Sequence, residues 1–259
     1  DKATCISLNT NKDDAFVLLS NKKKIKSSLI IAADSRFSKM RSKMGISAFI
    51  RDFDKNMIVC RMKHEKPHKN IAYEFFRYNQ TQASLPCFKN ESSIVTTASK
   101  NSSENLMKMN DKKFNTEMEN NFNNFLGKMK VVGKRYSYPM VTTYAKKFVS
   151  SRFALIGDAA VGMHPVTANG FNLNLKGIEI LTDEINFSIK NKKDIGSDKT
   201  LENYQFKLHR SAIPLYLTTN SIVNLYTSNI LPAKITRQFV LRLANTVKPI
   251  KQTFLSILR

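Results

Sequence analysis

The sequence has no tryptophan, and its 259 residues include only three cysteines and eight glycines. Cys5, Cys60 and Cys87 are odd in number, far apart and in no Cys-x-x-Cys pair, which excludes a disulfide framework and a cysteine zinc site. No stretch reaches the roughly 18 consecutive apolar residues of a transmembrane helix. With 42% hydrophobic and 24% charged residues, the composition excludes a wholly disordered chain, a collagen and a coiled coil. We therefore expect a globular protein of the reducing cytosol.

Acidic residues are scarce. There are 20 Asp and Glu against 42 Lys and Arg, and the formal net charge is +22 at pH 7. Such a charge suggests a nucleic-acid partner, but lysine supplies most of it, and an AT-rich genome produces the same bias. The distribution of charge is more informative: residues 203–259 hold eight basic side chains and no acidic one. We therefore expect no specific nucleic-acid partner.

The acid-free segment, residues 203–259, also carries an apolar stripe. Its members are Ile235, Phe239, Leu243, Val247, Ile250, Phe254 and Leu258. A basic amphipathic helix of this kind suits an anionic membrane surface. The alternative is a terminal helical pair that packs on the rest of the protein and exposes its lysines to water.

Periodicity and turn residues predict a mixed α/β chain. We expect strands at 14–20 and 29–33 around a basic turn at 21–26, β-rich runs at 57–62, 71–78, 83–87 and 92–97, and a buried strand at 152–156. We expect helices at 38–44, 114–125 and 170–189, a loop at 99–110, and helices beyond residue 196 that Pro214, Pro232 and Pro249 interrupt. Phe114, Met118, Phe122 and Phe125 recur at helical spacing and are typical of a core face.

Residues 152–176 are the stretch most suggestive of chemistry. The predicted strand brings Asp158 to the carboxyl end of a sheet, where open α/β folds bind ligands. The small residues Ala159 and Ala160 allow a flat ligand to approach the backbone. Gly170 begins the next helix, whose N–H groups and positive dipole end favour an anionic or electron-rich group. The alternative is an ordinary strand-loop-helix crossover.

The sequence of this stretch, GDAAVGMHPVTANGFNLNL at 157–175, resembles the second FAD-binding motif of the para-hydroxybenzoate-hydroxylase-like flavin monooxygenases. Within them it is most similar to the ubiquinone-biosynthesis hydroxylases of the UbiH/UbiF/UbiM group, and to UbiM-type members above all. The run AADSRFS at 32–38 resembles the Asp-Gly motif of the family. Segments around 61–81 and 214–226 resemble its substrate domain and its C-terminal helices, so the similarity covers nearly the whole chain.

The resemblance implies FAD as cofactor and NAD(P)H as reductant. Asp158 would bind the ribityl hydroxyls of FAD, Pro165 would line the flavin face, and the backbone of 170–172 would point at the edge of the flavin ring. Asp34 and Arg36 would lie near the FAD. The full set of implied cofactor-binding residues is Asp34, Arg36, Gly157, Asp158, Ala159, Pro165, Gly170, Phe171 and Asn172.

The chain departs from the family pattern in several places. Ser35 and Asn174 stand where the family has glycine, and Asn169 replaces the usual Gln or His. The sequence also has no GxGxxG, the turn that holds the FAD pyrophosphate on a helix N-terminus. We therefore expect a chain that corresponds to the C-terminal two-thirds of such an enzyme, or a decayed copy of it, and that binds FAD weakly by itself.

The expected fold is α/β with mixed α+β character. It combines a partial FAD/NAD(P)-binding Rossmann-like domain, an antiparallel-sheet substrate domain and a C-terminal helical region. We place the remainder of the FAD-binding domain at 1–46, the substrate domain at 47–140, the second FAD motif and its helix at 141–190, and the C-terminal helices at 191–259.

The expected function is hydroxylation of the aromatic ring of a polyprenyl phenol or quinol in ubiquinone biosynthesis, with O2 as second substrate. The expected location is cytoplasmic, peripheral on the inner face of the membrane, with other ubiquinone-biosynthesis proteins as further partners. The alternatives are a related flavoprotein monooxygenase acting on another apolar substrate, and a catalytically inactive or basic membrane-binding protein. We assign no catalytic side chain.

One motif is rejected. Residues 64–68 read HEKPH, a literal HExxH zinc motif. Pro67 removes a helical N–H and disfavours helix at Lys66, whereas a zinc site of this type needs both histidines on one helix. We expect no metal here, and an edge of the substrate-domain sheet instead.

Overall fold

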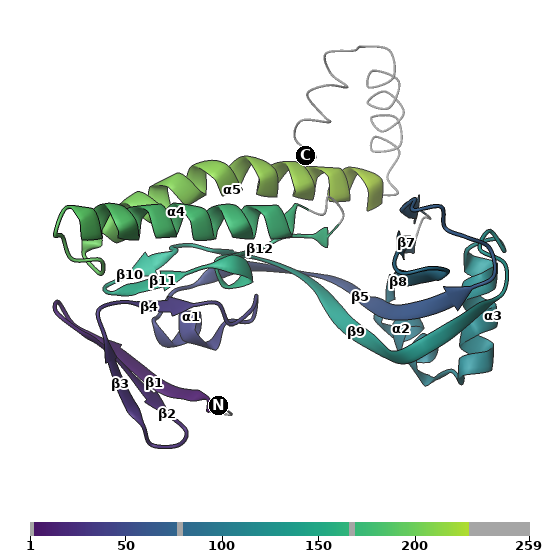
Figure 1. Ribbon diagram of the computed structural model, residues 1–259, viewed down its shortest axis with the longest axis horizontal. Coiled ribbons are helices and arrows are strands. Elements are labelled where there is room, and N and C mark those ends of the chain that lie inside the picture. The colour runs from purple at the N-terminus through teal and green to yellow at the C-terminus, as the bar shows by residue number, and fades with distance from the viewer. Residues whose placement is uncertain (1–2, 77–79, 166–168, 228–259) are drawn as a thin grey trace, which may run out of the picture. The chain divides into compact units, whose positions relative to one another are not determined.

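The computed structural model describes residues 3–76, 80–165 and 169–227 (Figure 1). The chain divides into two units: unit 1 comprises residues 1–51 and 141–259, and unit 2 comprises residues 52–140. The boundaries lie inside β5 (Ala48–His64) and β9 (Met129–Ala145), so both strands contribute to each unit. The mixture of sheets and helices confirms the predicted α/β class.

Unit 1 contains two small sheets. β1 (Cys5–Thr10), β2 (Ala15–Leu19) and β3 (Lys24–Ser27) form an antiparallel sheet in that order. The other sheet has the order β10-β11-β4, from β10 (Val149–Ser150), β11 (Phe153–Leu155) and β4 (Ile30–Ala32). β11 and β4 are parallel, which is the Rossmann-like feature expected from the sequence.

The helices of unit 1 cover its apolar core. α1 (Lys39–Lys43) follows β4, and the Ser38 side chain accepts a hydrogen bond from Arg41 N–H at its start. η1 (Gly157–Ala159) and β12 (Val161–Gly162) lead to α4 (Gly170–Lys190), which packs against α5 (Asp198–Thr227) (Figure 1). The hydroxyl of Tyr204 on α5 donates to the carbonyl of Leu155 at 2.6 Å, which fixes α5 to the end of β11.

Unit 2 is an antiparallel sheet with two helices. Its strands lie in the order β9-β5-β8-β7-β6, where β6 is Tyr73–Phe76, β7 is Thr81–Pro86 and β8 is Glu91–Ser99. The core between the sheet and α3 (Asp111–Asn121) includes Phe114, Met118 and Phe122, all fully buried. The predicted core face is therefore confirmed for Phe114, Met118 and Phe122, but α3 ends at Asn121, so Phe125 lies beyond the helix and is only partly buried.

Three expectations about secondary structure were wrong. Residues 99–110 are not a loop: α2 (Lys100–Lys108) lies there, begun by a cap in which the Ser99 hydroxyl accepts from Ser102 N–H, and it buries Leu106. The basic turn at 21–26 is shorter than expected, since β3 already begins at Lys24. α5 continues through Pro214 instead of stopping there.

Two further points concern the C-terminal half of the chain. The sequence reading did not anticipate β9, a 17-residue strand that contains Gly133 and Pro139. The expected C-terminal helices around Pro232 and Pro249, and the apolar stripe at 235–258, lie outside the described residues.

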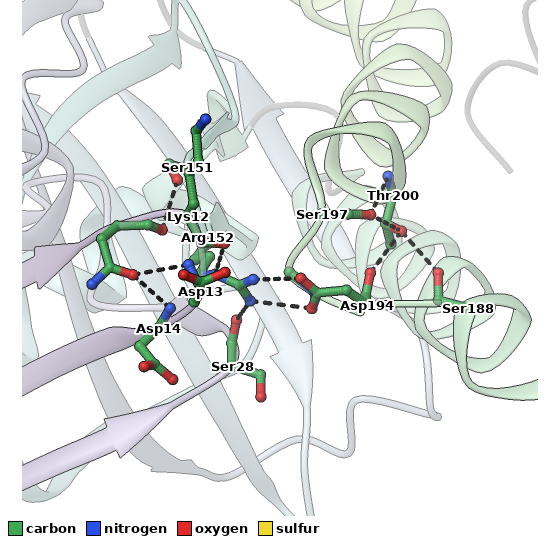
Figure 2. Close-up of polar contacts among 12 residues, drawn as sticks. Lys12, Asp13, Asp14, Ser28, Ser151, Arg152, Ser188, Asp194, Ser197 and Thr200 are labelled. Atoms are coloured by element: carbon green, nitrogen blue, oxygen red, sulfur yellow. Dashed lines mark hydrogen bonds and ion pairs between the residues drawn. The ribbon is translucent and has the colours of Figure 1, made fainter. Parts of the chain in front are cut away.

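A buried arginine joins three loops of unit 1 (Figure 2). Arg152 is 5% exposed, and its guanidinium donates to the carbonyls of Lys12 at 2.7 Å and Ser28 at 2.9 Å. It also forms a two-pronged ion pair with Asp194, in the connection between α4 and α5. Gly196 is required beside it, because a Cβ there would lie 2.2 Å from the Ser28 carbonyl oxygen. We call this group the Arg152 clamp.

The Arg152 clamp makes a prediction about acid stability. Hydrogen bonds from Arg152 lower the pKa of Asp194. A carboxyl group with a lowered folded-state pKa stabilises the fold above its unfolded pKa, and that contribution is lost as the pH falls through the folded pKa. We expect Asp194→Asn to lower the free energy of unfolding by about 1–2 kcal/mol at neutral pH. The difference from the natural chain should close below about pH 4.

Urea unfolding at neutral and acid pH measures this difference. Glu202→Gln, at an exposed carboxylate on α5, is the control and should change little. A gap between the natural chain and Asp194→Asn that persists unchanged into acid would contradict the role given to the ion pair.

A second stability prediction concerns Gln82 on β7. This side chain is 1% exposed, and neither amide atom has a hydrogen-bond partner among the described residues. It lies opposite Thr96, whose hydroxyl contacts Met118 Sδ at 3.6 Å, so the amide faces the apolar core of unit 2. Buried polar groups without partners destabilise a fold.

We therefore expect Gln82→Met to raise the free energy of unfolding by about 1 kcal/mol. The matched control is Gln205→Met, because Gln205 Oε1 accepts from Phe148 N–H at 2.8 Å and that substitution should destabilise. Denaturant titration of both variants decides. A loss of stability in Gln82→Met would mean that the amide has a partner in solution.

Candidate functional site

Parallel pairing of β4 with β11 brings two distant loops of unit 1 to one sheet edge. Leu155 lies opposite Ala32, so both strands end together, and Ile156 N–H donates to the Ala32 carbonyl at 3.0 Å. Beyond β4 the chain continues with residues 34–36, and beyond β11 with residues 157–158. The two motifs singled out in the sequence therefore lie beside each other, at the edge where such folds bind ligands.

An ion pair connects the two loops. Arg36 donates to Asp158 Oδ2 from Nε at 3.1 Å and from Nη2 at 2.6 Å, and its Nη1 donates to the Val141 carbonyl at 2.7 Å. Both charged side chains are about three-tenths exposed, at 28% and 29%. Asn174, on the first turns of α4, donates to Asp158 Oδ1 at 3.0 Å. The carboxylate is thus oriented by three donors, while Oδ1 accepts only one of them and retains a further lone pair.

Two residues that the sequence analysis missed support this pair. Arg41 is 4% exposed, and its guanidinium donates to the Ala159 carbonyl at 2.8 Å and to the Arg36 carbonyl at 3.1 Å. Burial lowers the pKa of Arg41. Gly162 lets Arg36 pass, because a Cβ there would lie 3.0 Å from Arg36 Cβ. No sequence signal marks Arg41, because its acceptors are backbone carbonyls.

The first motif is also shaped by its helix. Asp34 accepts from the Ser38 hydroxyl at 2.5 Å and from Met40 N–H at 3.0 Å, so its carboxylate holds the start of α1. Ser35, which stands where the family has glycine, adopts φ +81°. Side chains disfavour this left-handed region by roughly 1–2 kcal/mol. The backbone therefore retains the conformation that glycine would adopt, without the glycine.

The second motif leads into the N-terminus of α4. Asn169 occupies the cap position, but its side chain makes no capping hydrogen bond. The first N–H groups of a helix have no acceptor within the helix, which applies here to Gly170, Phe171 and Asn172. Both Phe171 and Asn172 are exposed.

The remaining predicted residues take different positions. Gly157 adopts φ +63°, a left-handed conformation that favours glycine. The side chain of Ala159 is fully buried in the apolar core of unit 1. Its backbone carbonyl accepts a hydrogen bond from Arg41. Pro165 is exposed and directly precedes residues 166–168, which lie outside the described part of the chain.

A buried aromatic cluster lies between β9 and α5 in unit 1. The Tyr144 hydroxyl lies 2.9 Å from His209 Nδ1, and Phe148 stacks on the imidazole with ring centroids 4.1 Å apart. Burial raises the pKa of Tyr144 to about 12 and lowers that of His209. At neutral pH both groups are therefore uncharged, and the pair serves packing of β9 against α5.

His64 of the HExxH motif has two protein partners, whereas His68 accepts at Nδ1 from Asn70 N–H at 2.9 Å and its buried Nε2 has no hydrogen-bond partner among the described residues. His64 lies at the end of β5, with Nδ1 2.7 Å from the Lys66 carbonyl oxygen and Nε2 3.0 Å from Ser92 Oγ. Both ring nitrogens are occupied, and burial lowers the pKa of this histidine. Within the described residues there is also no group of three His, Cys, Asp or Glu side chains arranged to hold a metal ion.

Comparison with known proteins assigns the chain to a class. The family model for the FAD binding domain matches residues 7–212, and the chain belongs to this family. It is 39% identical over 245 residues to ubiquinone hydroxylase UbiM of Neisseria meningitidis, a match that covers 95% of this chain and 53% of that protein. Ubiquinone hydroxylase UbiL of Rhodospirillum rubrum is 28% identical over 253 residues, covering 98% and 59%. The chain thus spans a little over half the length of these relatives.

Solved structures support the fold. The Diels-Alderase PyrE3 has a TM-score of 0.78 at 14% identity, covering 99% of this chain and 55% of that one. The p-nitrophenol 4-monooxygenase PnpA of Pseudomonas putida has a TM-score of 0.77 at 12% identity, covering 99% and 66%. In the described part of this chain, no helix combines the length and hydropathy that crossing a bilayer requires.

The conformation of Ser35 makes a testable prediction. Ser35→Gly removes the side chain from a left-handed position and should raise the free energy of unfolding by roughly 1 kcal/mol. Ser35→Ala is the matched control, since it deletes the hydroxyl but keeps the Cβ, and it should not stabilise. Thermal or urea unfolding of the three proteins measures the difference. Equal effects of glycine and alanine would show that the hydroxyl, not the backbone, sets the stability at this position.

Proposed function

We propose that this chain is the flavin-facing part of an FAD-dependent monooxygenase that hydroxylates the ring of a polyprenyl phenol or quinol in ubiquinone biosynthesis. The observation that carries the proposal is the meeting of Asp158, Arg36 and the start of α4 at one sheet edge. Membership of the FAD binding domain family, and similarity to two ubiquinone hydroxylases, support it. NAD(P)H is the proposed reductant and O2 the second substrate.

The residues present fit one end of FAD. Asp158 offers an oriented carboxylate with a remaining lone pair, which suits the ribityl hydroxyls. The N–H groups at 170–172 and the positive end of the α4 dipole suit the electron-rich edge of the ring. The exposed loop ending at Pro165 would line the ring face. The pyrophosphate end has no counterpart, because the sequence contains no GxGxxG.

Bound FAD would supply the redox chemistry, and the protein would supply position and electrostatics. Arg36 holds the Asp158 carboxylate in place by two charge-assisted hydrogen bonds. Asn174 fixes the other carboxylate oxygen, and Arg41 locks the two loops together. Asp34 would act indirectly, through its hold on α1, and we propose no acid-base side chain.

The sequence also favours an anionic membrane surface as partner, through the acid-free segment 203–259, and a peripheral location on the inner face of the membrane. Other ubiquinone-biosynthesis proteins are proposed partners by the same similarity. The alternative that a specific observation favours is an inactive chain, since the amide of Asn174 occupies an acceptor of Asp158 and the pyrophosphate turn is lacking.

Flavin titration tests the binding half of the proposal. The chain has candidate binding groups for the ribityl chain and the flavin ring, but none for the pyrophosphate. It should therefore bind riboflavin and FAD with similar, weak affinities. Asp158→Ala should lower both affinities about ten- to a hundredfold, since a charge-assisted hydrogen bond contributes about 1.5–3 kcal/mol. Quenching of flavin fluorescence measures the affinities. Asp183→Ala, at an exposed carboxylate on α4, is the control.

The outcomes separate the readings. Flavin binding that Asp158→Ala leaves unchanged would contradict the site, and stoichiometric, tight binding of FAD would contradict the lack of a pyrophosphate-binding turn.

A second experiment tests the reaction. The chain is joined behind a GxGxxG-containing segment taken from the Neisseria meningitidis relative and supplied with NADH or NADPH, O2 and a polyprenyl phenol. A product that gains one oxygen atom supports hydroxylation. Flavin binding without turnover would favour the inactive reading.

A further inference from the structure

The antiparallel sheet of unit 1 carries a charged feature that the hydroxylase proposal does not use. Its hairpin, β2 and β3 with the turn between them, spans residues 15–27, and we call it the lysine hairpin. Four of its last six residues are Lys22, Lys23, Lys24 and Lys26. All four are exposed, and the first three form no ion pair with any described residue. Lys26 forms an ion pair with Asp14 at 2.7 Å.

The lysine hairpin also exposes apolar side chains. Register places Leu18 opposite Lys24 and Phe16 opposite Lys26, so that apolar and basic groups alternate on its outer face. The ammonium groups of Lys24 and Lys26 lie 4.7 and 6.0 Å from the centre of the Phe16 ring. Leu18 on this face is 37% exposed, whereas Ile25, opposite Val17, lies on the other face of the hairpin and is 41% exposed.

Local hydrogen bonds shape the tip of the hairpin. Lys22 adopts φ +66°, Lys22 N–H donates to the Leu19 carbonyl at 2.9 Å, and Lys23 N–H donates to Asn21 Oδ1 at 3.1 Å. The Arg152 clamp fixes the opposite end of the sheet, at Lys12 and Ser28. Figure 1 shows the β2–β3 turn at the end of this sheet that is remote from β4. The basic groups are therefore presented together rather than on a loose loop.

We propose that the lysine hairpin docks this protein on the surface of a bilayer rich in anionic lipid. Lysine ammonium groups attract anionic headgroups, and their long stems let the charge reach the headgroup layer while the apolar neighbours enter the interface. Duplex nucleic acid fits less well: the four basic groups are all lysines, whereas arginine is preferred for phosphate recognition, and the exposed aliphatic groups would find no counterpart there. The inference rests on charge and exposure, not on the hydroxylase function.

Vesicle sedimentation with the full chain tests the proposal. The vesicles are phosphatidylcholine alone or phosphatidylcholine mixed with phosphatidylglycerol. The variant Lys22→Glu/Lys23→Glu/Lys24→Glu reverses three charges on the hairpin. The matched control, Lys190→Glu/Lys192→Glu/Lys193→Glu, reverses three exposed lysines at the end of α4 and so changes the net charge equally. Circular dichroism checks that each variant folds, and a glutamine triple variant at the hairpin removes charge without reversing it.

The natural chain should bind the anionic vesicles, bind neutral ones poorly, and release them as salt is raised. The hairpin variant should lose affinity by about tenfold or more, since each surface lysine contributes measurably to anionic lipid binding, while the α4 control keeps most of it. Leu18→Ser, on the face that carries Lys24 and Lys26, should weaken the binding that remains at high salt. Flavin titration should be unaffected in all of them.

Three results would overturn the proposal. Equal losses in the hairpin and α4 variants would assign binding to total charge, and unchanged binding in the hairpin variant would assign it to another segment. Stronger and equally hairpin-dependent binding of duplex DNA, with vesicles displaced by it, would assign the surface to nucleic acid. A failure of flavin binding with intact vesicle docking would count against the hydroxylase proposal alone.

Discussion

The site depends on the parallel pairing of two three-residue strands, β4 and β11. These strands are separated in sequence by all of unit 2, so their pairing closes a very long loop, and closure costs conformational entropy before any contact compensates it. Hydrogen bonds between the loops that follow the two strands offset part of this entropy cost. Arg41 bonds one loop to the carbonyl of the other, and Arg36 reaches the same second loop through Asp158. The apolar strands bring the loops together, and the two arginines keep them in register.

The parts of this site that the sequence predicted are those whose contacting residues lie close together in the chain. The strand, turn and helix of residues 152–190 are local, with a buried strand, a glycine at the turn and an apolar helix face, and each was predicted within a few residues. The family resemblance placed Arg36 and Asp158 near the FAD, but their ion pair was not predicted, because no spacing rule relates positions 122 residues apart. The role of Arg41 could not be derived, since its acceptors are backbone carbonyls that carry no side-chain signal.

The errors in secondary structure have similar causes. α2 is rich in serine and asparagine, which favour loops by their local hydrogen bonds, yet the same chemistry at Ser99 caps the helix and Leu106 anchors it in the core. β9 includes a glycine and a proline and lacks strict alternation of polar and apolar residues, so its 17 residues gave no strand signal. In both cases tertiary packing outweighs local preference. The strain at Ser35 and the amide of Asn174 are further conflicts, and they fall at the candidate site, where such conflicts concentrate.

The position of β4 has a consequence for how this polypeptide behaves in a concentrated solution. β4 is the last strand of its sheet in the described part of the chain, and Ile31 at its centre is 45% exposed. On α4, Phe171, Leu175 and Ile178 recur at helical spacing and are 71%, 49% and 44% exposed. A strand at the end of a sheet presents a row of backbone donors and acceptors that another chain can extend. Where nothing covers it, such an edge recruits neighbouring copies, so overexpression would favour aggregation unless a further strand and helix shield the apolar surface.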